Sequence, residues 1–155
     1  MKKFKKYLAF ILYWTIQLTW GCLLTIPGII ITLFAILIGG TPHKNGFSYI
    51  VEIGGNWGGL ELGAVALCGR YYENDLYWFE HTRKHEFGHS IQQLMFGPFQ
   101  LFIVGIPSAI RYWYQTIRNY KHLPNKPYDS IWFEGTATKW GTKWVDLIEN
   151  NNVDN

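Results

Sequence analysis

The feature that most restricts the fold is an uncharged apolar stretch near the N-terminus. Residues 8–38 contain no Asp, Glu, Lys or Arg, and they follow a start that carries four lysines. A membrane-spanning helix needs about 20 consecutive apolar residues, so this stretch is long for one span and short for two. Gly21, Pro27 and Gly28 interrupt its middle and favour a bend near Pro27. We therefore expect residues 1–39 to form a membrane anchor, either a kinked helix or a helical hairpin, that is transmembrane or re-entrant.

The lysines at the start raise the question of whether this stretch is a cleaved signal peptide or a retained membrane anchor. A cleaved signal peptide would show the same basic start and apolar core. However, no small-x-small cleavage motif follows at the expected place, and the apolar stretch continues beyond it, which favours an anchor that is retained. Since lysine-rich flanks stay in the cytoplasm, we predict an integral membrane protein with a cytoplasmic N-terminus and the lipid bilayer as a partner.

Composition narrows the class of protein further. Aromatic residues make up 18% of the chain, and Trp and Tyr are typical of surfaces where apolar and aqueous phases meet. The net charge of +3 is small and the basic residues are scattered, so we expect no nucleic-acid partner. The two cysteines, Cys22 and Cys68, do not indicate a disulfide scaffold.

Residues 40–150 are predicted to form an α+β domain. Apolar alternation and turn residues predict, in chain order, a strand over 47–53, a hairpin loop over 54–59, a strand over 60–68, a helix within 76–96 and a last helix that ends near residue 149. Asp129 or Ser130 can cap that last helix. We expect the Asn-rich residues 151–155 to be a disordered tail.

A second apolar run, residues 99–113, is broken by Gly105 and Pro107. Because about 15 residues fall short of a full span, we predict a short membrane-associated segment over 98–114 that is re-entrant or interfacial. Such a segment keeps the regions before and after it on the same side of the membrane. The basic residues around it favour the cytoplasmic side, and the alternative is one tilted crossing with these regions outside.

The sequence His85-Glu86-Phe87-Gly88-His89 lies within the predicted helix. Histidines spaced by four stack on one helix face, where both imidazoles can bind one Zn²⁺. Glu86 lies about 100° around the helix from His85, so it can reach a water on the open side of the metal but not act as a ligand on that face. Because the composition predicts only about 0.007 such matches by chance, we favour a zinc site over a solvated helix face.

A catalytic zinc site needs a third protein ligand and an open position. Glu134 lies in the first turn of an otherwise aromatic helix, where an inward carboxylate is costly unless it is paired or bound to metal. The alternative is a solvated glutamate that the helix dipole favours. His81 continues the histidine row, but three residues on one straight helix cannot surround one ion, so we interpret it as a surface residue or a residue behind the ligands.

These motifs resemble the gluzincin group of zinc metallopeptidases, in which two histidines and a downstream glutamate bind zinc and the motif glutamate activates water. The string His85 to Gln92, followed by Gly105 to Ser108, is most similar to a set of small bacterial membrane proteins with no established substrate. This resemblance covers roughly residues 46–141. It implies a minimal zincin-like fold, made of a β-hairpin, an active-site helix and a C-terminal helix, in a bacterial membrane. The basic residues around the site, not the resemblance, lead us to expect that the site faces the cytoplasm.

Carried over residue by residue, the resemblance makes His85, His89 and Glu134 the zinc ligands and Glu86 the general base. The wider group often has Asp four residues after the ligand glutamate, where this chain has Thr138. Either Thr138 or Asp129 substitutes for it, or the support of the ligands is weaker. The strand upstream of the helix also matches the zincin plan, in which an edge strand pairs with extended substrate.

The leading hypothesis is a membrane-associated, zinc-dependent peptidase that hydrolyses a peptide or protein substrate with a metal-activated water and Glu86 as general base. Tyr128 and His122 are candidates to stabilise the oxyanion. A second hypothesis is a non-catalytic membrane adaptor with a structural zinc, for which His81 or Asp129 would be a fourth ligand. A third is a membrane interaction protein without metal. The oligomeric state is open.

Overall fold

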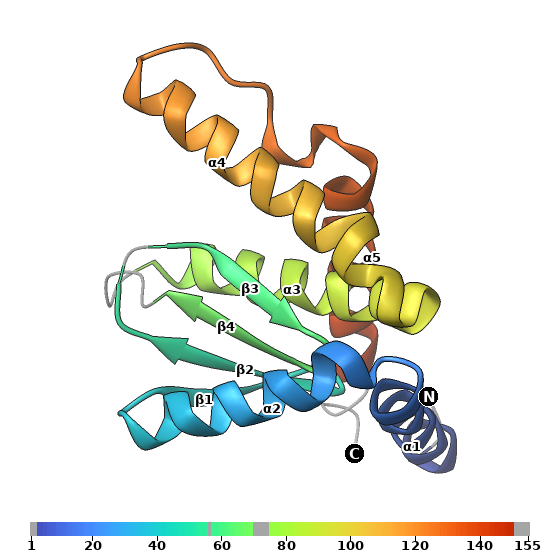
Figure 1. Cartoon of the computed structure of the whole chain (residues 1–155). Helices are drawn as coiled ribbons and strands as arrows, with labels where there is room; N and C mark the ends of the chain where they lie inside the picture. The colour runs from blue at the N-terminus through green and yellow to red at the C-terminus, as the bar shows by residue number, and fades with distance from the viewer. Residues whose placement is uncertain (1–2, 56, 70–74, 151–155) are drawn as a thin grey trace.

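The chain folds as α+β, with the sheet between two helical layers (Figure 1). The computed structural model describes residues 3–55, 57–69 and 75–150, and in these residues five α-helices and one four-stranded mixed sheet are present. The elements are α1 (Lys3–Thr19), α2 (Cys22–Leu37), β1 (Thr41–Asn45), β2 (Ser48–Ile53), β3 (Gly59–Leu62), β4 (Val65–Gly69), α3 (Leu76–Phe96), α4 (Ile106–Tyr120) and α5 (Trp132–Asn150). The predicted tail, 151–155, lies outside the described residues.

The sheet has the order β1-β2-β4-β3 and differs from the predicted hairpin. β2 and β4 pair in parallel, so the segment that follows Ile53 is not a hairpin loop. The single strand predicted over 60–68 is wrong, because Gly63 has a φ of +76° and turns the chain back between β3 and β4. Residues 41–45, for which the sequence predicted no strand, form β1 and pair antiparallel with β2. β3 is therefore an edge strand.

The two faces of the sheet are covered by different helices. Ile50, Ala66 and Cys68 are buried against Phe79 of α3 on one face. The neighbouring positions Val51 and Leu67 pack against Ala35 of α2 on the other face. This alternation follows from the two-residue period of a strand. The sheet is thus covered by α3 on one face and by α2 on the other, and α5 packs against α3 (Figure 1).

The N-terminal apolar stretch forms two helices that are bent by 99°. The bend lies at Gly21 and not near Pro27, which is accommodated inside α2. The Gly21 carbonyl accepts from the backbone N–H of Thr25 in the first turn of α2 and also from the Gln93 amide at 3.3 Å, so the bend is tied to α3. In the described residues no single helix is long and apolar enough to cross a membrane, whereas two bent helix pairs satisfy length and composition together, α1 with α2 and the α3 and α4 regions.

Helices α3 and α5 approach closely through two glycines. A Cβ on Gly88 would lie 1.9 Å from the Ala137 carbonyl oxygen, and one on Gly141 would lie 1.7 Å from the Lys84 carbonyl oxygen. The obstructing atoms belong to the backbone, which cannot rotate away as a side chain can. The two glycines thus set how near α5 comes to α3.

We expect Gly141→Ala to lower the free energy of unfolding by about 1–3 kcal/mol, because the added methyl group must push the helices apart. Gly54→Ala is the matched control, since a Cβ there meets no atom within 4 Å. Urea unfolding followed by circular dichroism measures both. Equal stability of the two variants would contradict the close packing described here.

Candidate metal centre

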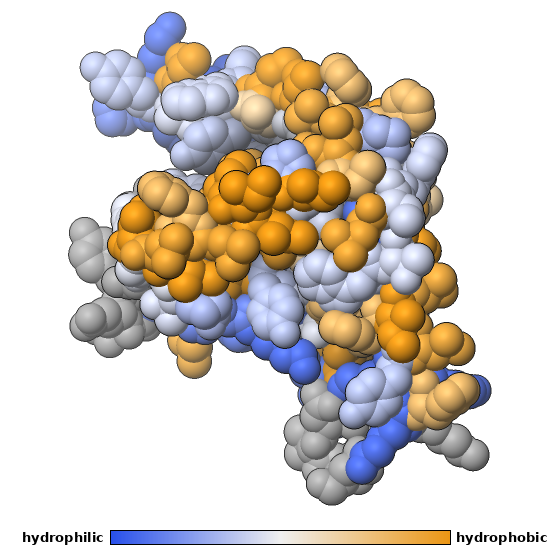
Figure 2. All heavy atoms as spheres, turned by 60° about the horizontal axis from the view of Figure 1, so that its bottom comes forward, coloured by the Kyte–Doolittle hydropathy of each residue, from blue (hydrophilic) through white to orange (hydrophobic). Residues whose placement is uncertain are grey.

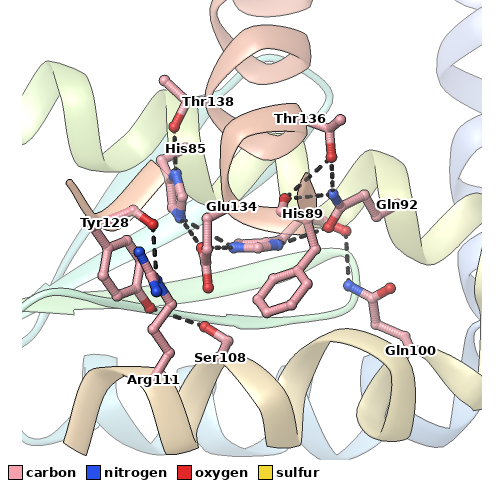
Figure 3. Close-up of polar contacts among 11 residues, drawn as sticks. His85, His89, Gln92, Gln100, Ser108, Arg111, Tyr128, Glu134, Thr136 and Thr138 are labelled. Carbon is pink, nitrogen blue, oxygen red and sulfur yellow. Dashed lines mark hydrogen bonds and ion pairs between the residues drawn. The ribbon is translucent and has the colours of Figure 1, made fainter. Parts of the chain in front are cut away.

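Three side chains from two helices converge on one point (Figure 3). His85 and His89, one turn apart on α3, bring their Nε2 atoms to 3.0 Å from each other. Glu134, in the first turn of α5, places Oε2 3.1 Å from Nε2 of His85 and 3.2 Å from Nε2 of His89. Glu134 has no exposed surface, so the alternative of a solvated glutamate is wrong.

The spacing of these three donor atoms fits a metal ion. Tetrahedral zinc has bonds of about 2.0–2.1 Å to nitrogen and oxygen, which places its ligands about 3.3 Å apart. The three donor atoms lie 3.0, 3.1 and 3.2 Å from one another, close to that spacing, so these residues could hold a zinc ion. The group contains three protein ligands in the part of the chain that is described, and this leaves a position open.

The electrostatics of Glu134 also suit a cation. Burial opposes its ionisation, but the hydrogen bonds with His85 and His89 outweigh burial and lower its pKa below the usual range. Its second oxygen, Oε1, is buried and has no hydrogen-bond partner among the described residues. A buried carboxylate with a free oxygen is costly in an apolar interior, and a metal ion would supply the missing positive charge.

Each histidine is oriented by a polar side chain behind it. Nδ1 of His85 lies 2.8 Å from Oγ1 of Thr138, and Nδ1 of His89 lies 2.8 Å from Oε1 of Gln92. An amide oxygen can only accept, so Nδ1–H of His89 donates to Gln92, and Nε2 faces Glu134, whose hydrogen bond and charge raise the pKa of His89 to about 9 despite burial. A metal ion at Nε2 would take the place of the Nε2 proton, and Gln92 would then hold the remaining proton on Nδ1. Thr138 thus lies behind His85, where the gluzincin resemblance implied an Asp.

Gln92 was not predicted from the sequence. Its amide nitrogen donates at 2.7 Å to both the Phe133 carbonyl and Oγ1 of Thr136, so it ties His89 to the start of α5 (Figure 3). The signal available was its position three residues after His89, on the same helix face.

Glu86 lies beside the three ligands but outside their group. Its carboxylate rests on the backbone of β3, where a Cβ on Gly59 would lie 2.2 Å from Oε1, and the backbone N–H of Glu61 donates to it. Burial raises its pKa, although the histidines oppose this. The carboxylate borders a cavity of about 710 Å³, so it can meet a bound molecule.

The cavity lies between the edge strand β3 and helix α4. Gly58 to Glu61 line part of the cavity, and so do His85, His89 and Glu86. The apolar lining consists of Trp57, Leu60, Val104, Ala109, Tyr112 and Trp113, and no lysine or arginine of the described chain lines it. It can therefore accept an apolar group next to the metal centre.

The structure brings Tyr128 to this cavity but not His122. Tyr128 Oη lies 3.0 Å from Oγ of Ser108, and its ring centroid lies 6.2 Å from that of His85. Burial raises the pKa of Tyr128, so the hydroxyl keeps its proton at neutral pH. Arg111 donates to the Tyr128 carbonyl at 2.9 Å and holds this segment. His122 is exposed beyond the end of α4 and is not among the lining residues.

His81 and Asp129 both line the cavity, and neither belongs to the ligand group. The His81 ring stacks on His85 with centroids 6.3 Å apart, because both lie on the same face of α3. Glu61 is a lining residue that the sequence did not reveal, since it alternates with Leu60 and Leu62 as an outward residue would. Burial raises its pKa to about 8.

No protein-family model, no curated protein and no solved structure matches this chain. The gluzincin resemblance therefore depends on the residues and their geometry alone.

We expect the purified protein to carry about one zinc ion per chain, and His89→Ala to lose it, because two remaining donors hold zinc weakly. His122→Ala is the control that removes a histidine away from the group. Elemental analysis after dialysis measures the metal. Absence of bound metal from the wild type, or equal metal in His89→Ala, would exclude the site.

Replacing Thr138 with Val should weaken zinc binding about 10–100-fold, because the Nδ1 proton of His85 loses its acceptor. Thr116→Val removes a comparable hydroxyl from the exposed side of α4, where it donates to the Tyr112 carbonyl. Competition with a chromophoric chelator compares the affinities. An unchanged affinity in Thr138→Val would show that the hydroxyl does not orient the ligand.

Proposed function

We propose that this protein is a zinc-dependent peptidase of gluzincin type. The observation that carries the proposal is the convergence of the His85, His89 and Glu134 donor atoms, at 3.0–3.2 Å from one another, beside a buried glutamate and an open cavity. Two imidazole nitrogens and one carboxylate oxygen, with a free fourth position, form a set that suits catalytic zinc. Zinc bound there would polarise a carbonyl group and lower the pKa of a water.

The role proposed for Glu86 follows from its surroundings. A general base works best when its pKa is near the working pH, and burial raises the pKa of Glu86 from that of a solvated glutamate. Its contact with the β3 backbone restricts where the carboxylate can point. Glu86 would take a proton from the attacking water and return it to the leaving amine.

Tyr128 is the better supported of the two oxyanion candidates. It lines the cavity, retains its proton at neutral pH and is held by Ser108 and Arg111. A neutral phenol that is fixed in place can donate a hydrogen bond to a developing oxyanion without reorganising. His122 lacks this placement and is not proposed for the role.

The edge strand suggests how a peptide would bind. On one side β3 pairs with β4, and Gly59 and Leu60 border the cavity, where an extended chain could lie beside them; the N–H of Glu61 already donates to Glu86. An extended peptide can add to such an edge through backbone hydrogen bonds, with its side chains in neighbouring pockets. The apolar lining then favours peptides with apolar or aromatic residues near the cleaved bond.

The structural-zinc hypothesis has less support. It called for a fourth protein ligand, and neither His81 nor Asp129 joins the ligand group in the described residues. A closed site with four protein donors is the usual structural form, whereas this group borders a cavity.

Glu86→Gln should keep zinc and lower peptide cleavage by about 10²–10⁴-fold, because the amide cannot accept the proton. The readout is hydrolysis of a library of quenched-fluorescent peptides with apolar centres, together with the zinc content. Glu52→Gln, on β2 beside His43, is the matched control and should retain both. A wild type that binds zinc but cleaves none of the peptides, or an active Glu86→Gln, would count against this mechanism.

A further inference from the structure

The N-terminal helices carry their apolar side chains on the outside. On α2 the buried positions are Thr25, Gly28, Thr32 and Ala35, which are small or polar. The outward positions are large and apolar, and they include Leu23, Ile26, Ile30, Phe34 and Leu37, each at least half exposed. A helix that faces water has the opposite arrangement. Figure 2 shows hydrophobic residues gathered across the centre of the face that lies underneath in Figure 1, where α2 lies.

The inner side of the pair is held by a buried polar network. Gln17 on α1 donates to the Ser90 carbonyl at 3.0 Å, and Thr25 on α2 donates to Gln17 at 3.0 Å. Tyr13 is hydrogen-bonded to Ser90, directly after the ligand His89. Because these contacts join α1 and α2 to α3, the outward apolar side chains cannot turn inward without breaking the network.

Both ends of the helix pair attach to the same folded body. Near the start of α1, Lys6 donates to the Ile148 carbonyl at the end of α5 at 2.8 Å. In the middle of α2, Gly28 lies so close to β3 that a Cβ would be 2.3 Å from the Leu62 carbonyl oxygen. After α2 the chain enters β1 directly. The pair therefore lies along the body over its whole length instead of projecting from it.

Helix α4 adds a second apolar stripe. Ile106, Ile110, Trp113 and Ile117 follow the helical repeat and are all exposed. In Figure 2 apolar side chains continue above α2, in the upper part of the view where α4 lies. Trp113 also lines the cavity, so the stripe extends to the cavity itself.

We infer that the protein is monotopic: the outer faces of α1, α2 and α4 enter one leaflet of a bilayer, no helix crosses it, and the cavity lies near the lipid surface. The outward face of α1 and α2 combines large apolar side chains with no charge between residues 8 and 38, which matches the apolar layer of a bilayer, and two helices joined by a bend can both lie in one membrane plane. The exposed Lys3 and Lys5 at the start of α1 suit anionic headgroups and assign the leaflet to the cytoplasmic side. This inference is independent of the proposed zinc chemistry.

The first test is flotation of the full chain with vesicles of phosphatidylcholine and phosphatidylglycerol. The wild type should float with the vesicles, and the double variant Ile30→Glu, Phe34→Glu should bind at least tenfold less, because two charges would enter the apolar layer. The matched control is Leu76→Glu, Tyr77→Glu, which alters exposed apolar residues at the start of α3 and should float normally. Thermal unfolding verifies that both variants fold.

The second test distinguishes a helix in the membrane plane from a crossing helix. A fluorescent dye is attached to cysteine at position 23, 30 or 37 in a Cys22→Ser chain, since Cys68 is buried, and is quenched by lipids that carry nitroxides at different depths. The three positions should report the same shallow depth, whereas a crossing helix would show a gradient of about 20 Å over its length. A depth gradient along α2 would overturn the proposal, and so would a wild type that does not float with vesicles. The proposal would also fail if the protein forms dimers without lipid and the Ile30→Glu, Phe34→Glu variant does not.

Discussion

The contact between α3 and α5 is the interaction on which the rest of the structure depends. Gly88 and Gly141 allow the two helix backbones to approach, and only at that distance can Glu134 reach histidines that lie 45 or more residues earlier. Gln92 strengthens the same contact through the Phe133 carbonyl and Thr136. The α3–α5 contact thus brings the candidate ligand group together and, through Gln92, orients His89. The free energy of unfolding and the affinity for metal should therefore depend on the same interface.

Two buried glutamates in this site have opposite electrostatics. Burial alone would raise the pKa of both, but the hydrogen bonds with His85 and His89 lower that of Glu134, whereas Glu86 keeps a raised pKa. The difference arises because only Glu134 shares its oxygen with both imidazoles. Carboxylates whose environments drive their pKa values apart are suited to different tasks, one to hold a cation and one to exchange a proton.

The sequence predicted the helices better than the sheet. The helix around His85 and the helix that contains Glu134 follow from apolar period, caps and breakers, and these signals are local. The hairpin was wrong because the alternation from Leu60 to Cys68 continues through Gly63, where the chain in fact reverses. Glu61 was missed for a related reason. A strand residue between two leucines is expected to point into solvent, whereas in the structure Glu61 lines the cavity and burial raises its pKa.

The sequence by itself determined which groups could bind a metal, because the spacing of His85 and His89 on a helix is a local property. It also determined that the N-terminal stretch has no charge to place in water. Only the tertiary structure decided that Glu134 lies within reach of both histidines, in a group that could hold a metal ion, and that Thr138 and Gln92 lie behind the histidines. Those contacts depend on how closely two helices distant in the chain approach, and no periodic pattern in either helix specifies that distance.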